Sequence, residues 1–263
     1  MPPDADASSA AAPAPETTTD RVLGGRLTLR QPVAGHRVGH DALLLAAFAP
    51  VDRRCAVDLG AGVGSAGLAF LARVGQAQAT LVEIAPELAA LASENAAANG
   101  LAERVAVVTG DVRVLGRPSG PPLPEAGAAD LVLCNPPFNA HARHRTSPDA
   151  ARARAHMADG ALLDDWVRAA DRCLAARGVL CLIHRPEALA ELLAALAGRF
   201  GAAEILPVHP RPDRPAVRVL VRAVKGRRAA PALLPGLVLA ERDGTPTAAA
   251  EAVLRDGEGL TPA

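Results

Sequence analysis

The residues Asn135-Pro136-Pro137-Phe138 are the part of this sequence best suited to chemistry, because they end an apolar run with a stiff turn. Each proline fixes its φ angle and lacks an N–H donor, so we expect the carbonyls of Asn135 and Pro136 to point outward. The side-chain oxygen of Asn135 and the Pro136 carbonyl can together accept the two hydrogens of a planar amino group. The Phe138 ring can stack on the flat group that carries it. The turn therefore predicts a site for a purine amino group or an amide nitrogen.

A glycine-rich turn is the second candidate. Gly60-Ala61-Gly62-Val63-Gly64 follows the apolar run 55–59, which contains Asp58, and precedes a helical stretch that continues to Arg73. Glycines let the backbone approach a ligand closely, and the amides that open the helix can bind a carboxylate or a phosphate. The spacing differs from the dinucleotide fingerprint G-x-G-x-x-G, because Ser65 occupies the place of its third glycine. A tight packing turn without a ligand is the alternative interpretation.

Two acidic residues lie at the ends of neighbouring predicted strands. Glu83 lies 19 residues after Gly64, where a carboxylate can accept hydrogen bonds from both hydroxyls of a ribose. Asp111 follows the next strand and is placed to accept from an adenine amino group. The alternatives are a strand-end surface charge for Glu83 and a structural Gly-Asp turn for Asp111.

Short apolar runs alternate with helical segments, and this alternation predicts the fold. We expect a Rossmann-like α/β domain with a seven-stranded, mostly parallel sheet, helices on both faces and an antiparallel last strand. In such a sheet the ligand site lies at the carboxyl ends of the strands, which places the glycine turn, Glu83, Asp111 and the Asn-Pro-Pro-Phe turn at one edge. The predicted strands are residues 55–59, 79–84, 105–108, 130–134, 179–183, 205–208 and 217–224.

The rest of the chain predicts one domain with a tail. Residues 1–20 are rich in Ala, Pro, Ser, Thr and acids, and we expect them to be disordered. Residues 21–263 should form a single domain that opens with a short hairpin around Gly24-Gly25 and a helix capped by Asp41. We expect a substrate loop at 139–159, a helix from Leu162 that ends at Gly178, a further helix at 189–196, and a final strand and helix near 237–239 and 248–255.

Composition narrows the class of protein. The formal net charge is zero and half of the residues are hydrophobic, which favours a globular protein over a general polyanion binder. The four cysteines lack the spacing of a zinc site, so we expect core thiols, no metal, and a reducing cytoplasm. No apolar run is long enough to cross a bilayer, so no membrane association is expected.

Arginines are the candidates for contact with RNA. Solvated arginines are common on protein surfaces, and Arg218 and Arg222 lie within a predicted strand where they can instead pair with acids. His40 and His156 are expected to be structural and Trp166 to be a core residue. The nominated RNA-binding residues are Arg143, Arg145, Arg152, Arg154, Arg211, Arg214, Arg227 and Arg228.

Together, the segment 58–64, Glu83, Asp111 and Asn135-Pro136-Pro137-Phe138 resemble the class I S-adenosylmethionine-dependent methyltransferases that modify planar amino groups. Gln31 and the segment 35–44 are similar to the bacterial branch that methylates N6 of adenine in a valine tRNA. The resemblance implies S-adenosylmethionine as cofactor, bound by Asp58, Gly60, Gly62, Gly64, Glu83, Asp111 and Asn135, and an RNA substrate, with tRNA favoured. It also implies that the amino group is aligned by Asn135 and Pro136 while Phe138 stacks on the base.

The sequence leaves three other functions open and disfavours a fourth. Methylation of guanine N2 in rRNA and of glutamine N5 in protein use the same chemistry, and Phe138 stands where the adenine branch often has Tyr. A noncatalytic RNA-binding module could keep this fold, but it would have no need of the Asn135–Phe138 turn. A nicotinamide dehydrogenase is disfavoured by the glycine spacing.

Overall fold

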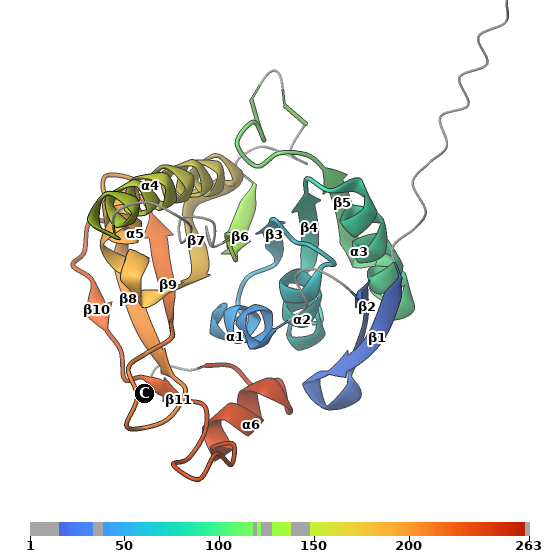
Figure 1. The fold of residues 1–263 in the computed structure, drawn as a ribbon. Coiled ribbons are helices and arrows are strands. Elements are labelled where there is room, and N and C mark those ends of the chain that lie inside the picture. Colours follow the sequence, from blue (N-terminus) through green and yellow to red (C-terminus); the bar gives the residue numbers. More distant parts are fainter. Residues whose placement is uncertain (1–15, 34–38, 118–119, 122–127, 138–147, 261–263) are drawn as a thin grey trace, which may run out of the picture.

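The structure, a computed structural model, is organised around one twisted β-sheet (Figure 1). It describes residues 16–33, 39–117, 120–121, 128–137 and 148–260, and only the backbone of 148–160. The strands follow the order β10-β8-β9-β7-β6-β3-β4-β5, with β11 also paired to β8. They are β3 (Cys55–Leu59), β4 (Gln78–Glu83), β5 (Val105–Thr109), β6 (Ala129–Cys134), β7 (Leu174–His184), β8 (Phe200–His209), β9 (Arg218–Lys225), β10 (Ala232–Leu233) and β11 (Leu237–Val238).

The predicted α/β fold is confirmed. β3, β4, β5, β6 and β7 run parallel to one another, while β9 is antiparallel to both β7 and β8. Two further strands, β10 and β11, extend the sheet beyond the seven predicted strands, and each is two residues long. β11 lies where the sequence predicted a final strand.

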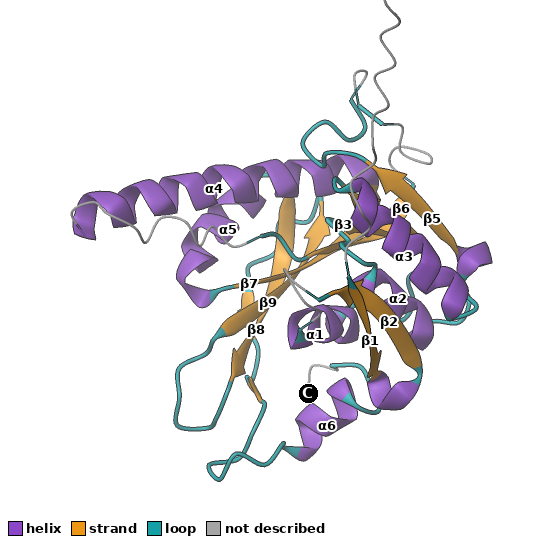
Figure 2. Ribbon diagram, turned by 45° about the vertical axis from the view of Figure 1, so that its right-hand side comes forward, coloured by secondary structure: helices purple, strands orange, loops and turns teal. Residues whose placement is uncertain are grey.

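Helices cover both faces of this sheet. One apolar core contains α1, α2 and α3 residues packed on Leu131 and Leu133, and the other contains α4 and α5 residues packed on Val132 and Cys134. Figure 2 shows α4 on the opposite side of the strands from α1 and α2. The helices are α1 (His40–Phe48), α2 (Ser65–Arg73), α3 (Pro86–Ala98), α4 (Pro148–Cys173), α5 (Leu189–Leu196) and α6 (Ala248–Leu254). None in the described part of the chain is long and apolar enough to span a membrane.

The N-terminal hairpin begins earlier than predicted. Strand β1 (Thr17–Val22) pairs with β2 (Leu27–Pro32), so residues 17–20 belong to the domain and not to a tail. Three of these four residues are half-buried and only Thr19 is exposed, and threonine has a high strand propensity, so they can pair as an edge strand without large apolar side chains. Residues 1–15 lie outside the described part of the chain.

Asp41 does not cap α1 as predicted. The cap position is occupied by Gly39, and Asp41 lies in the first turn, where its Oδ2 accepts a 2.8 Å hydrogen bond from Nε of Arg218. An acid in the first helical turn still interacts favourably with the positive end of the helix dipole. Neighbouring residues alone could not show this pairing, because Arg218 lies 177 positions away in the chain.

Helix α4 differs most from the prediction. Residues 148–159, expected to be loop, form its first turns, and it ends at Cys173, after which β7 begins directly at Leu174. Pro148 suits a first helical turn, and the many Ala and Arg residues that follow are strong helix formers. The irregular polar pattern hid this propensity.

The cysteine prediction holds for three of the four thiols. Cys134, Cys173 and Cys181 are buried, and burial raises the pKa of the Cys173 and Cys181 thiols to about 12. Cys55 is exposed because it is the first residue of β3, where the strand enters the sheet from the surface.

Candidate cofactor and substrate site

The carboxyl ends of four neighbouring strands bring the predicted residues together. Leu59 at the end of β3 pairs with Val82 of β4 and with Cys134 of β6, so these strands end level. Glu83 ends β4 and pairs with Thr109, the last residue of β5. The glycine turn, Glu83, Asp111 and Asn135 therefore lie at one edge of the sheet.

The glycine turn needs its glycines for two different reasons. Gly60, Gly62 and Gly64 have φ angles of 64°, 56° and 88°, which residues with a Cβ rarely adopt. Gly60 also lies against Trp166 of α4, since a Cβ at this position would be 2.3 Å from the indole Cη2. The turn is thus held in one shape by its own backbone and by the helix above it.

Asp58 supports this turn from within the core. Only 2% of the residue is exposed, and its Oδ2 accepts a 2.8 Å hydrogen bond from the backbone N–H of Gly67 in α2. The pKa of the carboxyl is raised from 3.8 to about 7, mainly because burial disfavours the charged form. The hydrogen bond from Gly67 lowers the pKa, and the negative charge of Glu83 raises it. Asp58 therefore joins the end of β3 to the start of α2.

Glu83 is buried but keeps the capacity to accept further hydrogen bonds. Its Oε2 accepts from the N–H of Gly62 at 2.8 Å, and its Oε1 accepts from the N–H of Ala85 at 2.9 Å. Each carboxylate oxygen has about two acceptor positions, so one remains on each oxygen. This arrangement can receive the two hydroxyls of a ribose.

Asp111 is engaged by one neighbour. Its Oδ1 accepts from the backbone N and Nε of Arg113 at 2.8 and 3.1 Å, and its Oδ2 accepts from Nε and Nη2 at 2.9 and 2.6 Å. The hydrogen bond from the guanidinium group is the main reason that the pKa of Asp111 is lowered. A ligand amino group at Asp111 must therefore compete with Arg113.

A cavity of about 380 Å³ opens among these elements. Of the predicted residues, Gly60, Asp111 and Pro137 line it. Ala161, Leu162, Asp165 and Trp166 of α4 form another wall, and of these the sequence had singled out only Trp166, as a core residue. Trp166 is indeed buried, at 6% exposed. Its position beside the cavity was not foreseen, because an apolar helical face has the same sequence pattern whether it covers a core or borders a cavity.

The Asn-Pro-Pro turn lies beside this cavity. Asn135 follows the buried Cys134 directly and is half-buried, Pro136 is buried, and Pro137 is exposed. Phe138 lies outside the described residues. The part of the turn that the structure describes is thus positioned by β6 and borders the cavity through Pro137.

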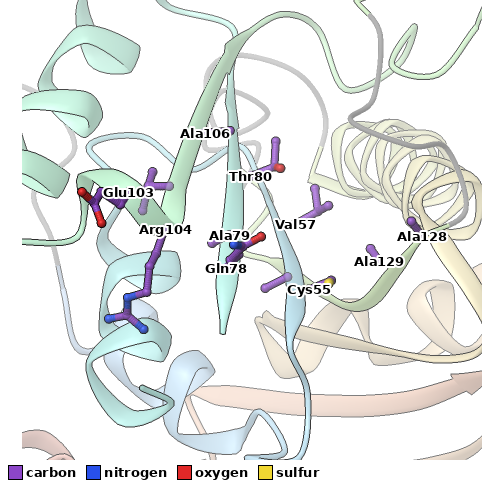
Figure 3. Close-up of a pocket in the computed structure, with 12 residues that line it drawn as sticks. Cys55, Val57, Gln78, Ala79, Thr80, Glu103, Arg104, Ala106, Ala128 and Ala129 are labelled. Atoms are coloured by element: carbon purple, nitrogen blue, oxygen red, sulfur yellow. The ribbon is translucent and has the colours of Figure 1, made fainter. Parts of the chain in front are cut away.

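A larger hollow lies elsewhere on the molecule. It measures about 440 Å³ and is lined by the starts of β3, β4, β5 and β6, with Cys55, Gln78 and Arg104 among its residues (Figure 3). None of the predicted site residues lines it, and the Arg104 guanidinium donates to the carbonyls of Val74 and Gly75 at 3.1 and 2.8 Å. Size alone does not make it the functional site, because the convergent acids and glycines are at the opposite ends of the strands.

The arginines separate into distinct groups. Arg218 and Arg222 pair with acids as expected, with Asp41 and Glu204 respectively. Arg211 and Arg214 lie between β8 and β9, at the carboxyl edge, because β8 and β7 are both antiparallel to β9. The nominated Arg227 and Arg228 follow β9 and lie at the other edge. Arg152 and Arg154 lie in the first turns of α4, and Arg143 and Arg145 lie outside the described residues.

Gln31 and the segment 35–44, which resemble the adenine-N6 branch, are described only in part. Gln31 is buried in β2, where its amide donates to the carboxylate of Asp20 across the hairpin. His40 is exposed at the start of α1. Residues 34–38 are not described. Among the described residues, no group of three or more His, Cys, Asp or Glu side chains is placed to hold a metal ion.

A parallel sheet with a glycine turn, strand-end acids and an Asn-Pro-Pro turn at one edge defines a Rossmann-like methyltransferase. The family model of the methyltransferase small domain matches residues 39–208, and the chain belongs to this family. It is an S-adenosylmethionine-dependent methyltransferase. The glycine turn, the free acceptor positions of Glu83 and the adjoining cavity fit this cofactor.

Known proteins support the assignment. A tRNA1(Val) (adenine(37)-N6)-methyltransferase of Porphyromonas gingivalis is 30% identical, over 77% of this chain and 80% of that protein. The protein of the same name from Aeromonas hydrophila is 32% identical, over 72% and 77%.

Solved structures show the same fold. A predicted O-methyltransferase from Agrobacterium tumefaciens has a TM-score of 0.68 and 31% identity, over 84% of this chain and 98% of that chain. A T. thermophilus 16S rRNA N2 methyltransferase, solved with AdoMet and guanosine, has a TM-score of 0.54 and 22% identity, over 80% and 50%.

Proposed function

We propose that this protein methylates N6 of an adenine in tRNA, with S-adenosylmethionine as the methyl donor. The observation that carries the proposal is the position of Asn135-Pro136-Pro137 at the end of β6, beside a cavity that also borders the glycine turn. The names of the similar proteins from P. gingivalis and A. hydrophila support the choice of tRNA and adenine. A tRNA substrate implies the cytoplasm as the place of action.

One half of the site would bind the cofactor and the other would align the substrate. Glu83 would accept from the ribose hydroxyls of the cofactor, and the glycine turn would let its backbone approach closely. Asp111 would accept from the cofactor adenine once Arg113 yields one of its hydrogen bonds. The bound cofactor supplies a methyl group on a positively charged sulfur, which is already a strong electrophile.

The chain then has to align the target nitrogen. The Asn135 side-chain oxygen and the Pro136 carbonyl would accept the two amino hydrogens, which turns the nitrogen lone pair toward the methyl group. Phe138 would stack on the base and fix its plane. Because the reaction needs alignment more than proton transfer, correct positioning supplies much of the acceleration.

The target base has to leave its stack to enter this site, at a cost of a few kcal/mol. Arginines at the carboxyl edge would offset part of that cost by binding phosphates. Arg211 and Arg214 lie at this edge, and Arg152 and Arg154 lie at the end of α4 that follows β6. Arg227 and Arg228, at the other edge, could contact only a more distant part of a large RNA.

The test is to incubate the protein with S-adenosylmethionine labelled in its methyl group and, separately, with tRNA, rRNA and a protein extract. Label in tRNA, recovered as N6-methyladenosine and lost with Asn135→Ala, supports the proposal. Label in guanine of rRNA or in protein glutamine would replace the proposed substrate. RNA binding without calorimetric binding of the cofactor would indicate a noncatalytic module.

A further inference from the structure

Asn95 of α3 connects three parts of the molecule through one side chain. Its Oδ1 accepts from the backbone N–H of Arg30 at 2.7 Å, and its Nδ2 donates to the Arg30 carbonyl at 3.0 Å. The same Nδ2 donates to the carbonyl of Val63 at 3.0 Å. Asn95 is fully buried, at 0% exposed. A buried amide with all of its donors used is costly to disturb, so it holds these partners in fixed positions.

The bond to Val63 reaches the glycine turn. Val63 lies between Gly62, whose N–H donates to Glu83, and Gly64, which precedes α2. The turn is therefore held from two sides, by Glu83 at an N–H group and by Asn95 at a carbonyl group. Backbone hydrogen bonds from Ala61 to Val82 and from Gly64 to Ala61 also hold the turn, and Asn95 adds the side-chain bond that fixes the Val63 carbonyl between two glycines at positive φ.

Asn99, the cap residue at the carboxyl end of α3 and one helical turn after Asn95, provides an internal comparison. Its Oδ1 accepts from the N–H of Thr28 at 2.9 Å, and its Nδ2 donates to the Thr28 carbonyl at 2.7 Å. Its other donor is used by the carbonyl of Asn95, within its own helix, at 2.7 Å. Both asparagines thus bind the backbone of β2 in the same way, and only Asn95 also holds the glycine turn.

We propose that Asn95 is a positioning residue for cofactor binding: it joins the N-terminal hairpin to the glycine turn and fixes the turn in the shape that receives S-adenosylmethionine. The hairpin, attached through Arg30, thereby stabilises the cofactor site although none of its described residues lines the cavity. The inference concerns the cofactor alone and does not depend on which RNA or protein is methylated.

The test compares Asn95→Asp with Asn99→Asp by calorimetric binding of S-adenosylmethionine and of S-adenosylhomocysteine, well below the melting temperature of each variant. Asn95→Asp replaces the donor to Val63 with an oxygen that repels the carbonyl. We expect the Kd to rise about ten-fold, the size of one hydrogen bond to a buried group. Asn99→Asp should lower Tm and change Kd less than about two-fold, since it leaves the turn untouched.

Hydrogen exchange distinguishes positioning from general destabilisation. Asn95→Asp should speed exchange of the amides in residues 60–67, whereas Asn99→Asp should speed it only in β2 and the end of α3. If Asn95→Asp does not fold, Asn95→Ser is measured in the same way. The proposal would be overturned if Asn95→Asp and Asn99→Asp bound the cofactor with the same Kd, whether or not that Kd differs from the value of the unaltered protein. A purely structural role would lower Tm in both variants and would not weaken cofactor binding more in Asn95→Asp than in Asn99→Asp.

Discussion

Replacing Asp58 with Asn should make the protein more stable at neutral pH. Burial raises the pKa of this carboxyl from 3.8 to about 7, so the folded protein favours its neutral form. Its contribution to stability is therefore fully present below pH 3.8 and is lost as the pH rises through 7. Asparagine keeps an oxygen to accept from the Gly67 N–H and carries no charge at any pH.

The size of the effect follows from the pKa. Each unit corresponds to 1.36 kcal/mol, so a rise of about three units corresponds to about 4 kcal/mol in the free energy of unfolding. The difference between Asp58→Asn and the unaltered protein should grow by up to about 4 kcal/mol from pH 4 to pH 8. Urea unfolding at intervals of half a pH unit measures it directly.

Asp52→Asn is the control. The Asp52 side chain is 71% exposed and pairs with Arg53 at the surface, so its replacement should change stability by less than about 1 kcal/mol at every pH. A stability difference for Asp58→Asn that is the same at pH 5 and pH 8 would refute the assignment of a buried, neutral-favouring carboxyl to this position.

Three further predictions concern the cavity, and the chain's single tryptophan, Trp166, gives a fluorescence signal for cofactor binding in each. Gly60→Ala should abolish the signal and lower Tm, because its Cβ would lie 2.3 Å from the indole at a φ of 64°; an unchanged Kd would contradict this packing. Glu83→Ala should weaken cofactor binding, whereas Asn135→Ala should leave it nearly intact and slow turnover about 100-fold; equal loss of binding in both would disprove this division of roles. Arg113→Ala should tighten cofactor binding because it frees Asp111, and weaker binding would show instead that Arg113 serves the ligand.

The sequence predicted the elements that local patterns define. The sequence predicted the seven strands because buried strands appear as short apolar runs. It also predicted the hairpin and the helices α2, α3 and α5, whose boundaries are marked by Pro86, by glycines or by the spacing of apolar residues. The convergence of the glycine turn, Glu83 and Asn135 at one edge follows from parallel strands alone.

What the sequence could not reveal depends on contacts between distant residues. Asp41, expected to cap a helix, pairs instead with Arg218, 177 positions away, while Gly39 occupies the cap position. Trp166 was expected only as core, since no local signal tells that Gly60 lies beneath it. The amide of Asn95 looks like any polar residue on a helix until the fold places Arg30 and Val63 around it.

The central claim is tested most directly by nucleoside mass spectrometry. Valine tRNA made without modifications is incubated with S-adenosylmethionine and either the unaltered protein or Asn135→Ala, and digested to nucleosides. We predict N6-methyladenosine with the unaltered protein and a loss of at least about 100-fold in its rate of formation with Asn135→Ala, which should still bind the cofactor. No methylated adenosine with the cofactor-bound, unaltered protein, or equal rates with both proteins, would contradict the account.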